Sequence, residues 1–240
     1  MKFTKQALTA GLLLYLITGT AQSALVSRAG GTMIYDTDLD ITWIANANLF
    51  KTQATSDPNL VSSIITNVGT ISDSYFGPHT LTTSDFNTSS GKMTWWGARA
   101  WAANLNYGGY SGWRLPNLIT ATTTYLPLTD SELSHLSELS HLFYSDLGGS
   151  IGSSITVSHN ANFDLFSNVE PFIYWLSADY ESNAWFFYTS NGNQNFRNKD
   201  LSLYGWAVHS GDVAAVPILG SIWLFGSAIL GLLRLKRRSK

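Results

Sequence analysis

The sequence contains no cysteine and few charged residues, which make up 12% of its 240 positions. Without cysteine the chain has no disulfide framework, no thiolate metal site and no cysteine-dependent catalysis. Ion-pair networks are also excluded as the main support of the fold. Aromatic residues, by contrast, reach 13% and include nine Trp. We therefore expect one compact domain with a core of large aromatic side chains.

The basic residues are concentrated at the two ends of the chain. Seven of the fourteen Lys and Arg lie within residues 2–5 and 234–240. The remaining seven face sixteen acidic residues, so the middle of the protein carries a net charge of about -9. Nucleic-acid binding depends on basic contacts to phosphates, and we expect no nucleic-acid partner.

The N-terminus has the pattern of a secretory signal peptide. Lys2 and Lys5 precede an apolar run over residues 7–17, and the small residues of 21–23 stand where signal peptidase reads the chain. We expect cleavage after Ser23, with Ala24 as the neighbouring alternative. A permanent anchor is disfavoured because the apolar run is too short to span a bilayer comfortably.

The C-terminus has the pattern of a membrane-spanning helix. Residues 213–233 carry no charge, and a helix of 21 residues covers the hydrocarbon thickness of about 30 Å. Its basic end is expected to stay in the cytoplasm. The predicted division is a signal peptide over 1–23, an exported domain over 24–212 and a membrane-embedded tail over 213–240.

The tail resembles the PEP-CTERM sorting tails of Gram-negative bacteria. The resemblance rests on Val216, Pro217, the run Trp223-Leu-Phe-Gly-Ser, and Arg234, Arg237 and Arg238. Leu219 stands where the family has a second proline. The resemblance implies that an exosortase processes the tail and passes the protein to the cell surface or its extracellular matrix. An ordinary single-span anchor is the alternative.

Periodicity predicts the secondary structure between these ends. Residues 32–45 alternate as two short strands around a polar turn, whereas 51–90 is interpreted as a long surface excursion with one short strand. A first helix is expected from the cap at Thr94 to the stop at Gly108-Gly109. Residues 172–213 predict three or four antiparallel strands, with a hairpin at Asn191-Gly192-Asn193.

A second helix is expected from Thr129, whose spacing to Glu132 makes a capping box, to Gly148-Gly149. It contains a tandem hexapeptide, in which Glu132-Leu-Ser-His-Leu-Ser is followed at once by Glu138-Leu-Ser-His-Leu. Six residues turn a helix by about 240° beyond whole turns, so the two copies cannot share one face. We expect the second copy to be buried and the first to be an extension.

The domain resembles the Lcl C-terminal domain family. The most specific element is Gly109-Tyr110 followed by Trp113-Arg114-Leu115-Pro116, a segment in which Arg114 needs a partner. The resemblance implies an α+β, C-type-lectin-like fold with two helices flanking small antiparallel sheets. The family's namesake is a surface adhesin that binds sulfated glycans. Because the domain here is acidic, we expect uncharged polysaccharide or a surface protein instead.

Aromatic and amide side chains in the last strands predict a ligand-binding surface, because they suit sugar rings and hydroxyls. These residues are Trp185, Tyr188, Asn191, Asn193, Gln194, Asn195 and Arg197. We expect a non-enzymatic protein. A purely structural matrix component and an envelope hydrolase built around one of the five His are the alternatives.

No metal site and no cofactor are expected. Asp36, Asp38 and Asp40 alternate, but the glycine and glutamate of an EF-hand are missing. Glu170-Pro171 lacks the asparagine of the lectin calcium motif. The two Glu-x-x-His copies lie at incompatible angles on one predicted helix.

Overall fold

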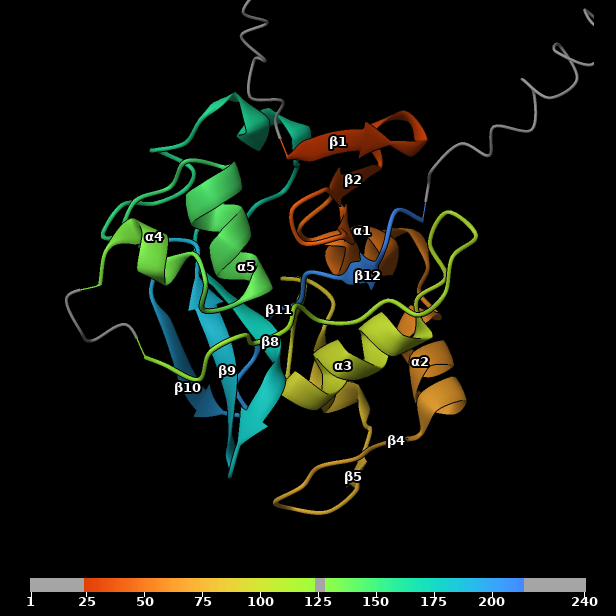
Figure 1. The fold of residues 1–240 in the computed structure, drawn as a ribbon. Coiled ribbons are helices and arrows are strands. Elements are labelled where there is room, and N and C mark those ends of the chain that lie inside the picture. The colour runs from red at the N-terminus through yellow and green to blue at the C-terminus, as the bar shows by residue number, and fades with distance from the viewer. Residues whose placement is uncertain (1–23, 124–127, 214–240) are drawn as a thin grey trace, which may run out of the picture.

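The computed structural model describes residues 24–123 and 128–213 and has an α+β architecture, which confirms that expectation (Figure 1). Its strands form a four-stranded, a six-stranded and a two-stranded sheet. The helices are α1 (Leu49–Ser56), α2 (Leu60–Val68), α3 (Trp95–Asn104), α4 (Asp130–Leu133) and α5 (Glu138–His141), which continues as a π-helical turn over Leu142–Asp146. Short 3-10 turns lie at Ala29–Gly31, Thr83–Asp85 and Ala161–Leu165.

The first and last described strands belong to the same antiparallel sheet. Its order is β1 (Leu25–Arg28), β2 (Met33–Asp36), β3 (Ile41–Ile44) and β12 (Val208–Ser210). The two strands expected within residues 32–45 are confirmed as β2 and β3. An ion pair between Arg28 and Asp212, with 2.7 Å from Nη2 to Oδ2, also joins the two ends of the domain.

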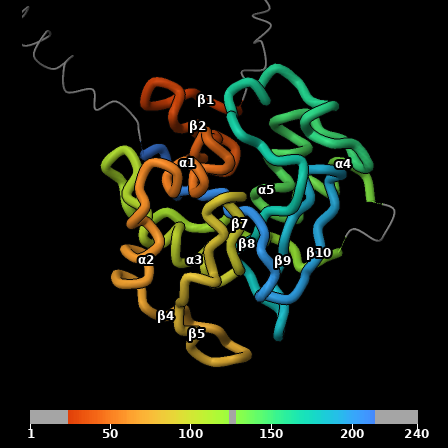
Figure 2. The backbone as a smooth tube through the Cα atoms, turned by 180° about the vertical axis from the view of Figure 1, so that it is seen from behind, coloured from red at the N-terminus to blue at the C-terminus, as the bar shows by residue number. Residues whose placement is uncertain are grey.

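The second sheet has six strands, and its central strands β8 and β9 are largely buried on both faces; Figure 2 shows the backbone of this sheet from behind. Its order is β10 (Gln194–Asn198), β9 (Asn183–Tyr188), β8 (Ile173–Tyr180), β11 (Leu203–Tyr204), β7 (Lys92–Met93) and β6 (Phe86–Asn87). Ile173 and Trp175 pack in the cluster that contains α3, whereas Tyr174 and Leu176 pack in the cluster that contains α5. A continuous apolar run, rather than alternation, is what a strand covered on both sides requires.

The hairpin between β9 and β10 confirms the signal at residues 191–193, and Gly192 takes a left-handed φ of 78° there. The expectation of purely antiparallel pairing was wrong at one place, since β11 pairs with β8 in parallel. The last strand, β12, leaves this sheet altogether and pairs with β3.

The start of α3 is as predicted and its end is not. The Thr94 hydroxyl accepts a hydrogen bond from the Gly97 N–H (3.1 Å), as a helix cap does. The helix ends at Asn104, before the expected stop at Gly108-Gly109, because Leu105 takes an extended conformation that buries its side chain. The two glycines instead form the tight turn that joins Tyr107 to Tyr110.

The helix expected from residue 129 is broken between the two copies of the hexapeptide. The capping box of Thr129 and Glu132 is confirmed, but α4 ends at Leu133. Ser137 then starts α5 with a second capping box to Ser140. Because the chain starts a new helix between the two copies, leucines of both copies can be buried. One continuous helix would turn them to different faces. The second copy is the more buried, as expected, because Glu138 is 7% exposed whereas Glu132 is exposed.

The segment 51–90 is more ordered than predicted. It contains most of α1, all of α2 and the short strands β4 (Thr70–Ile71) and β5 (His79–Thr80), besides β6. The prediction of a surface excursion with one strand was wrong. Phe50 and Ile64 are fully buried against the α3 cluster, so tertiary packing supplies the stability that their weakly patterned helices lack alone.

None of the helices in the described ranges is long and apolar enough to cross a membrane. The signal peptide of 1–23 and the sorting residues Val216, Pro217, Trp223, Arg234, Arg237 and Arg238 lie outside these ranges.

Candidate functional site

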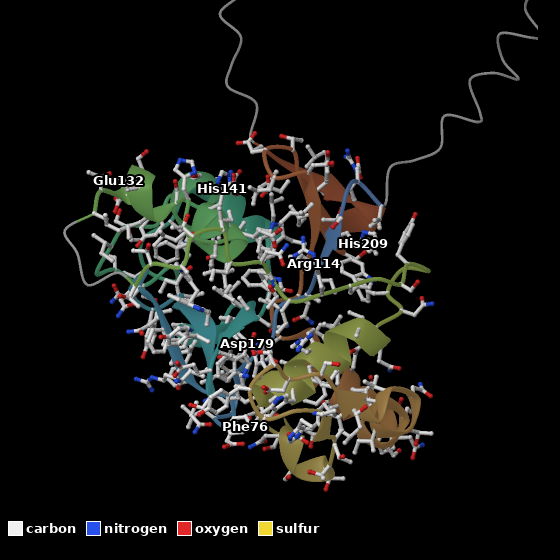
Figure 3. The ribbon with its side chains drawn as sticks, turned by 60° about the horizontal axis from the view of Figure 1, so that its bottom comes forward. Phe76, Arg114, Glu132, His141, Asp179 and His209 are labelled. Atoms are coloured by element: carbon white, nitrogen blue, oxygen red, sulfur yellow. The ribbon has the colours of Figure 1, made fainter. Side chains whose placement is uncertain are left out.

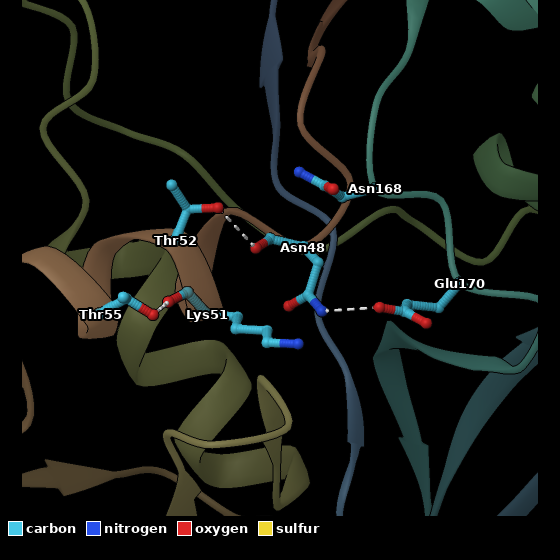
Figure 4. A pocket seen from close by; sticks show the side chains of 6 residues that line it. All are labelled: Asn48, Lys51, Thr52, Thr55, Asn168 and Glu170. Carbon is cyan, nitrogen blue, oxygen red and sulfur yellow. Dashed lines mark hydrogen bonds between the residues drawn. The ribbon is translucent and has the colours of Figure 1, made fainter.

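A polar pocket of about 310 Å³ opens beside α1 (Figure 4). Its α1 side is formed by positions 48, 51, 52 and 55, whose three- and four-residue steps place them on one helix face. On the other face, Leu49 and Phe50 are buried in the core. The residues that line the pocket are Asn48, Lys51, Thr52, Thr55, Asn168 and Glu170.

Asn48 is the most buried residue of the pocket, at 3% exposure. Its Nδ2 donates to Glu170 Oε1 (3.1 Å) and to the main-chain oxygen of Ser90 (3.3 Å). Its Oδ1 is shielded from bulk solvent and accepts no hydrogen bond from any described residue. Gly91 leaves room for this oxygen, since a Cβ at position 91 would collide with it. A buried amide oxygen of this kind calls for a donor from a ligand or from water.

The pocket wall is held by hydrogen bonds among side chains. Asn46 Nδ2 donates to Thr52 Oγ1 (2.8 Å), and Asn168 Nδ2 donates to Asn46 Oδ1 (3.0 Å). These bonds join α1 to the segment that carries Glu170. The wall is therefore preorganised, and its polar groups keep their positions before any ligand binds.

The pocket offers mostly neutral hydrogen-bonding groups. Glu170 supplies a carboxylate and Lys51 an ammonium, while the other lining side chains are amides and hydroxyls. The Glu170 carboxylate faces the amide of Asn48 rather than a further carboxylate. This arrangement suits a ligand rich in hydroxyls, which donate and accept in equal measure.

The seven residues predicted to bind a ligand lie on two faces of the β9–β10 hairpin. The register sets Gln194 opposite Phe187, Asn195 opposite Phe186 and Arg197 opposite Ala184. One face is interior, because Trp185 is 5% and Gln194 0% exposed. Trp185 packs edge-on against Phe196, with 5.4 Å between ring centroids.

The other face of the hairpin keeps part of the predicted set together. Tyr188 and Asn195 are half-buried and Arg197 is exposed, with the guanidinium 6.0 Å from the centroid of the Tyr188 ring. Asn191 and Asn193 shape the turn, since Asn191 Oδ1 accepts a hydrogen bond from the Asn193 N–H (3.0 Å). Tyr188, Asn195 and Arg197 are therefore the members that a ligand can reach on this face.

Two exposed aromatic residues that the sequence patterns did not single out lie in the loop between β4 and β5. Tyr75 is 58% and Phe76 56% exposed. The carboxylate of Asp73 accepts both of their N–H groups and also pairs with the buried Lys199 (2.8 Å). Lys199 pairs in turn with Asp179, which lies near Phe76 in Figure 3. The buried ion pairs of Lys199 thus hold the loop that carries the exposed Tyr75 and Phe76 in place.

A second buried polar cluster contains Asp36, His141 and Asp146. One ligand atom from each lies within 4.8 Å of the other two, and His141 Nε2 is 3.8 Å from Asp146 Oδ2. Burial raises the pKa of Asp36. Burial, together with the neighbouring carboxylates of Asp36 and Asp38, raises the pKa of Asp146 to about 8. These residues are the described ones that could hold a metal ion.

The sequence patterns drew attention to Asp36 and to His141 separately but did not connect them. Asp36 appeared in an alternating acidic turn and His141 in a Glu-x-x-His copy. In the structure Glu138 of that copy pairs with Arg114 instead, and His141 lies 3.8 Å from Asp146 and 4.0 Å from Asp38. A short-range sequence pattern cannot predict the contact between Asp36 and His141, because these residues lie about a hundred positions apart.

Comparison with known proteins gives one match. The family model of the Lcl C-terminal domain matches residues 32–209, which includes the pocket, the hairpin and the buried acidic cluster. No curated protein and no solved structure matches the chain. Because the match covers well over half of the sequence, the chain belongs to the Lcl C-terminal domain family.

Proposed function

We propose that this protein is an exported, non-enzymatic component of the cell surface or extracellular matrix, with a C-type-lectin-like domain that binds uncharged polysaccharide. The observation that carries the proposal is the preorganised polar pocket beside α1, whose exposed lining carries the hydroxyls of Thr52 and Thr55 and the amide of Asn168. Hydroxyls and amides of this kind both donate to and accept from sugar hydroxyls. The acidic character of the domain favours a neutral over a sulfated chain.

The arrangement of α3 and α5 supports the lectin-like architecture. The two helices lie in the two clusters on opposite faces of the six-stranded sheet. The first and last strands of the domain belong to the four-stranded sheet, and the Arg28–Asp212 ion pair joins the two ends. Both features belong to the fold that the family resemblance implies.

Binding is tested on a glycan array with the protein isolated from its host. We expect saturable binding to neutral polysaccharides and weaker binding to sulfated ones. Thr55→Val keeps the shape of an exposed pocket residue and removes its hydroxyl, so affinity should fall about 3- to 10-fold, the value of one hydrogen bond.

Thr66→Val is the matched control for this substitution. Thr66 is also exposed on a helix, and its hydroxyl donates to the carbonyl four residues earlier (2.8 Å), as that of Thr55 does. Thr66 lies on α2, away from the pocket lining, so its variant should bind like the unchanged protein. Equal losses in both variants, or no saturable binding at all, would support the structural matrix component instead.

Export and sorting are tested by mass spectrometry of the mature protein. We expect an N-terminus at Ala24 and the loss of residues 223–240 through exosortase processing. A mature chain that retains Trp223 to Lys240 would contradict the sorting proposal. A reporter fused after Asp212 that faces the cytosol would contradict export itself.

An envelope hydrolase remains the alternative class, because it needs a tight polar cluster around a histidine. His141 does lie in such a cluster, but it faces carboxylates, and no hydrogen bond of the described residues joins it to a serine or threonine hydroxyl. Activity screens on cell-wall and matrix polymers distinguish this class from a binder.

A further inference from the structure

Three buried polar atoms that have no hydrogen-bond partner among the described residues converge between β2 and the end of α5. They are Asp36 Oδ2, His141 Nε2 and Asp146 Oδ2. Asp36 is 0% and Asp146 4% exposed, and the side chain of His141 is 12% exposed with its Nε2 shielded. Buried polar groups in native proteins are nearly always satisfied, and because these atoms lie within 4.8 Å of one another, a single bound ion can satisfy all three. The indole of Trp43 beside Asp36, and a proton shared by Asp36 and Asp146, are the alternatives within the protein.

The surrounding structure holds the Asp36 carboxylate and the backbone of Asp146 in place. Asp36 Oδ1 accepts the N–H groups of Asp38 and Leu39, both at 3.0 Å, which leaves Oδ2 for another role. At Asp146, the main-chain oxygen accepts the side-chain amides of Asn160 and Asn162, both at 2.9 Å. Hydrogen bonds of this kind around the ligands orient them in protein metal sites.

The position of Asp146 depends on an unusual local structure. Leu142–Asp146 forms a π-helical turn that continues α5, and such turns occur frequently at functional sites. In this turn His141 and Asp146, five residues apart, approach to 3.8 Å. Two carboxylates buried this close repel each other unless a proton, the imidazole or a bound cation lies between them.

We propose that Asp36, His141 and Asp146 bind one divalent transition-metal ion of the Zn²⁺ or Mn²⁺ class. Asp38 lies at the exposed edge of the site, with its side chain 59% exposed and its Oδ2 4.0 Å from His141 Nε2, and water completes the coordination of the ion. The exposed side of Asp38 is also the route by which the ion enters. Imidazole with carboxylates favours these metals, whereas Ca²⁺ and Mg²⁺ prefer oxygen ligands alone.

The three ligand atoms have to draw together to accept the ion. Ligand atoms about 2.1 Å from a tetrahedral metal lie roughly 3.4 Å from one another. Here they lie within 4.8 Å of one another, with 3.8 Å between His141 Nε2 and Asp146 Oδ2. The ion would join the β2–β3 turn of the four-stranded sheet to α5, so its role is to stabilise the domain rather than to react with substrate.

The test uses the full chain in detergent, freed of metal with EDTA and dialysed. Zn²⁺, Mn²⁺ and Ca²⁺ are added separately, and bound metal is measured by inductively coupled plasma mass spectrometry and the midpoint of thermal unfolding by circular dichroism. We expect one Zn²⁺ or Mn²⁺ per chain and a midpoint that rises by several degrees. Pulsed electron paramagnetic resonance of the Mn²⁺ form should show coupling to one imidazole nitrogen.

The tandem hexapeptide offers a matched pair of variants. His141→Ala should weaken binding by more than about tenfold, while His135→Ala, the exposed equivalent in the first copy, should leave it unchanged. Asp146→Asn keeps the side-chain volume, and the new amide N–H can donate a hydrogen bond to the Asp36 carboxylate. It should therefore fold yet lose the metal response.

Three results would overturn the proposal. The first is the absence of binding by all three ions. The second is an unchanged metal response in Asp146→Asn, and the third is a preference for Ca²⁺ that His141→Ala does not alter. If two carboxylates sharing a proton were the whole explanation of the cluster, Asp146→Asn would be as stable as the unchanged protein and neither would respond to metal. None of these results depends on polysaccharide binding.

Discussion

Arg114 and Glu138 form a two-pronged ion pair across 24 residues of sequence, with 2.7 Å from Nη1 to Oε2 and 2.8 Å from Nη2 to Oε1. Glu138 Oε2 also accepts the N–H of Asn117 at 2.7 Å. The pair joins the Trp-Arg-Leu-Pro segment, the most specific family element, to the start of α5. It supplies the partner that the sequence predicts for Arg114.

Replacing Glu138 by Ala should lower the free energy of unfolding by about 3 kcal/mol, because Arg114 and the Asn117 N–H lose their acceptor in a partly buried site. Glu132→Ala, at the same place in the first hexapeptide copy, should cost clearly less, because it removes only the exposed half of a capping box. Urea unfolding of both variants measures the difference. Equal costs would show that the ion pair adds nothing beyond a cap.

Asp73 should make the domain sensitive to acid. Burial opposes its ionised form, but Lys199, the N–H groups of Tyr75 and Phe76 and the Trp96 indole outweigh this and lower the pKa to about 2. Because the pKa is below that of the unfolded chain, the stabilisation is present above pH 4 and is lost as the pH falls towards 2. It amounts to about 2 kcal/mol.

Urea unfolding between pH 2 and 5 checks this window. Asp73→Asn removes the titrating group, so its stability should fall less steeply with decreasing pH than that of the unchanged protein. Asp164→Asn replaces an exposed aspartate and should keep the original slope. Parallel curves for Asp73→Asn and the unchanged protein would exclude Asp73 as a source of acid sensitivity.

Gly91→Ala should damage the pocket as well as the fold. Gly91 has a φ of +83°, and an added Cβ would collide with Asn48 Oδ1. Gly77→Ala is the control, because Gly77 has a φ of +77° but nothing within 4 Å of a Cβ. Backbone strain of about 1 kcal/mol is common to both, and overpacking adds about 1–3 kcal/mol at position 91 alone.

The Gly91 variant is measured twice, for stability and for retention on polysaccharide. We expect Gly77→Ala to bind normally and Gly91→Ala to bind more weakly at a temperature where both are folded. Normal binding by folded Gly91→Ala would remove the pocket from consideration and leave the hairpin face as the candidate surface.

Two aromatic residues of the hairpin should respond differently to truncation. Trp185→Ala removes a buried side chain and should cost about 3–5 kcal/mol. Tyr188→Ala removes a half-buried one and should cost less than half as much, so that it can be assayed in the folded state. Weaker retention of Tyr188→Ala, with Thr55→Val unaffected, would move the binding site from the pocket to the hairpin.

Local signals in the sequence predicted local structure well. The cap at Thr94, the capping box of Thr129 and Glu132 and the turn at Gly192 each depend on residues at most four positions apart, and the structure confirms all three. The second cap at Ser137 has the same kind of signal, but the strong leucine periodicity of the duplicated segment favoured one continuous helix. The local capping signal at Ser137, together with the burial of leucines from both copies, therefore decided that the helix breaks.

The candidate sites were harder to predict because they are assembled by long-range contacts. Asn48, Lys51, Thr52 and Thr55 do follow a helical step, which could have indicated a polar face, but their segment has few apolar residues to mark it as a helix. Whether Trp185 faces solvent or core depends on what covers the sheet. The aromatic sequence of β9 alone does not contain that information.

The placement of the first and last strands in one sheet determines how the domain would resist a pulling force. Leu25 is in register with Asp36, Asp36 with Ile41 and Ile41 with Ser210, so the start of β1 and the end of β12 lie at the same end of one sheet. A pull applied at Val213 is resisted by the hydrogen bonds between β12 and β3 and by the Arg28–Asp212 pair. The β9–β10 hairpin lies in the other sheet and would be spared the strain.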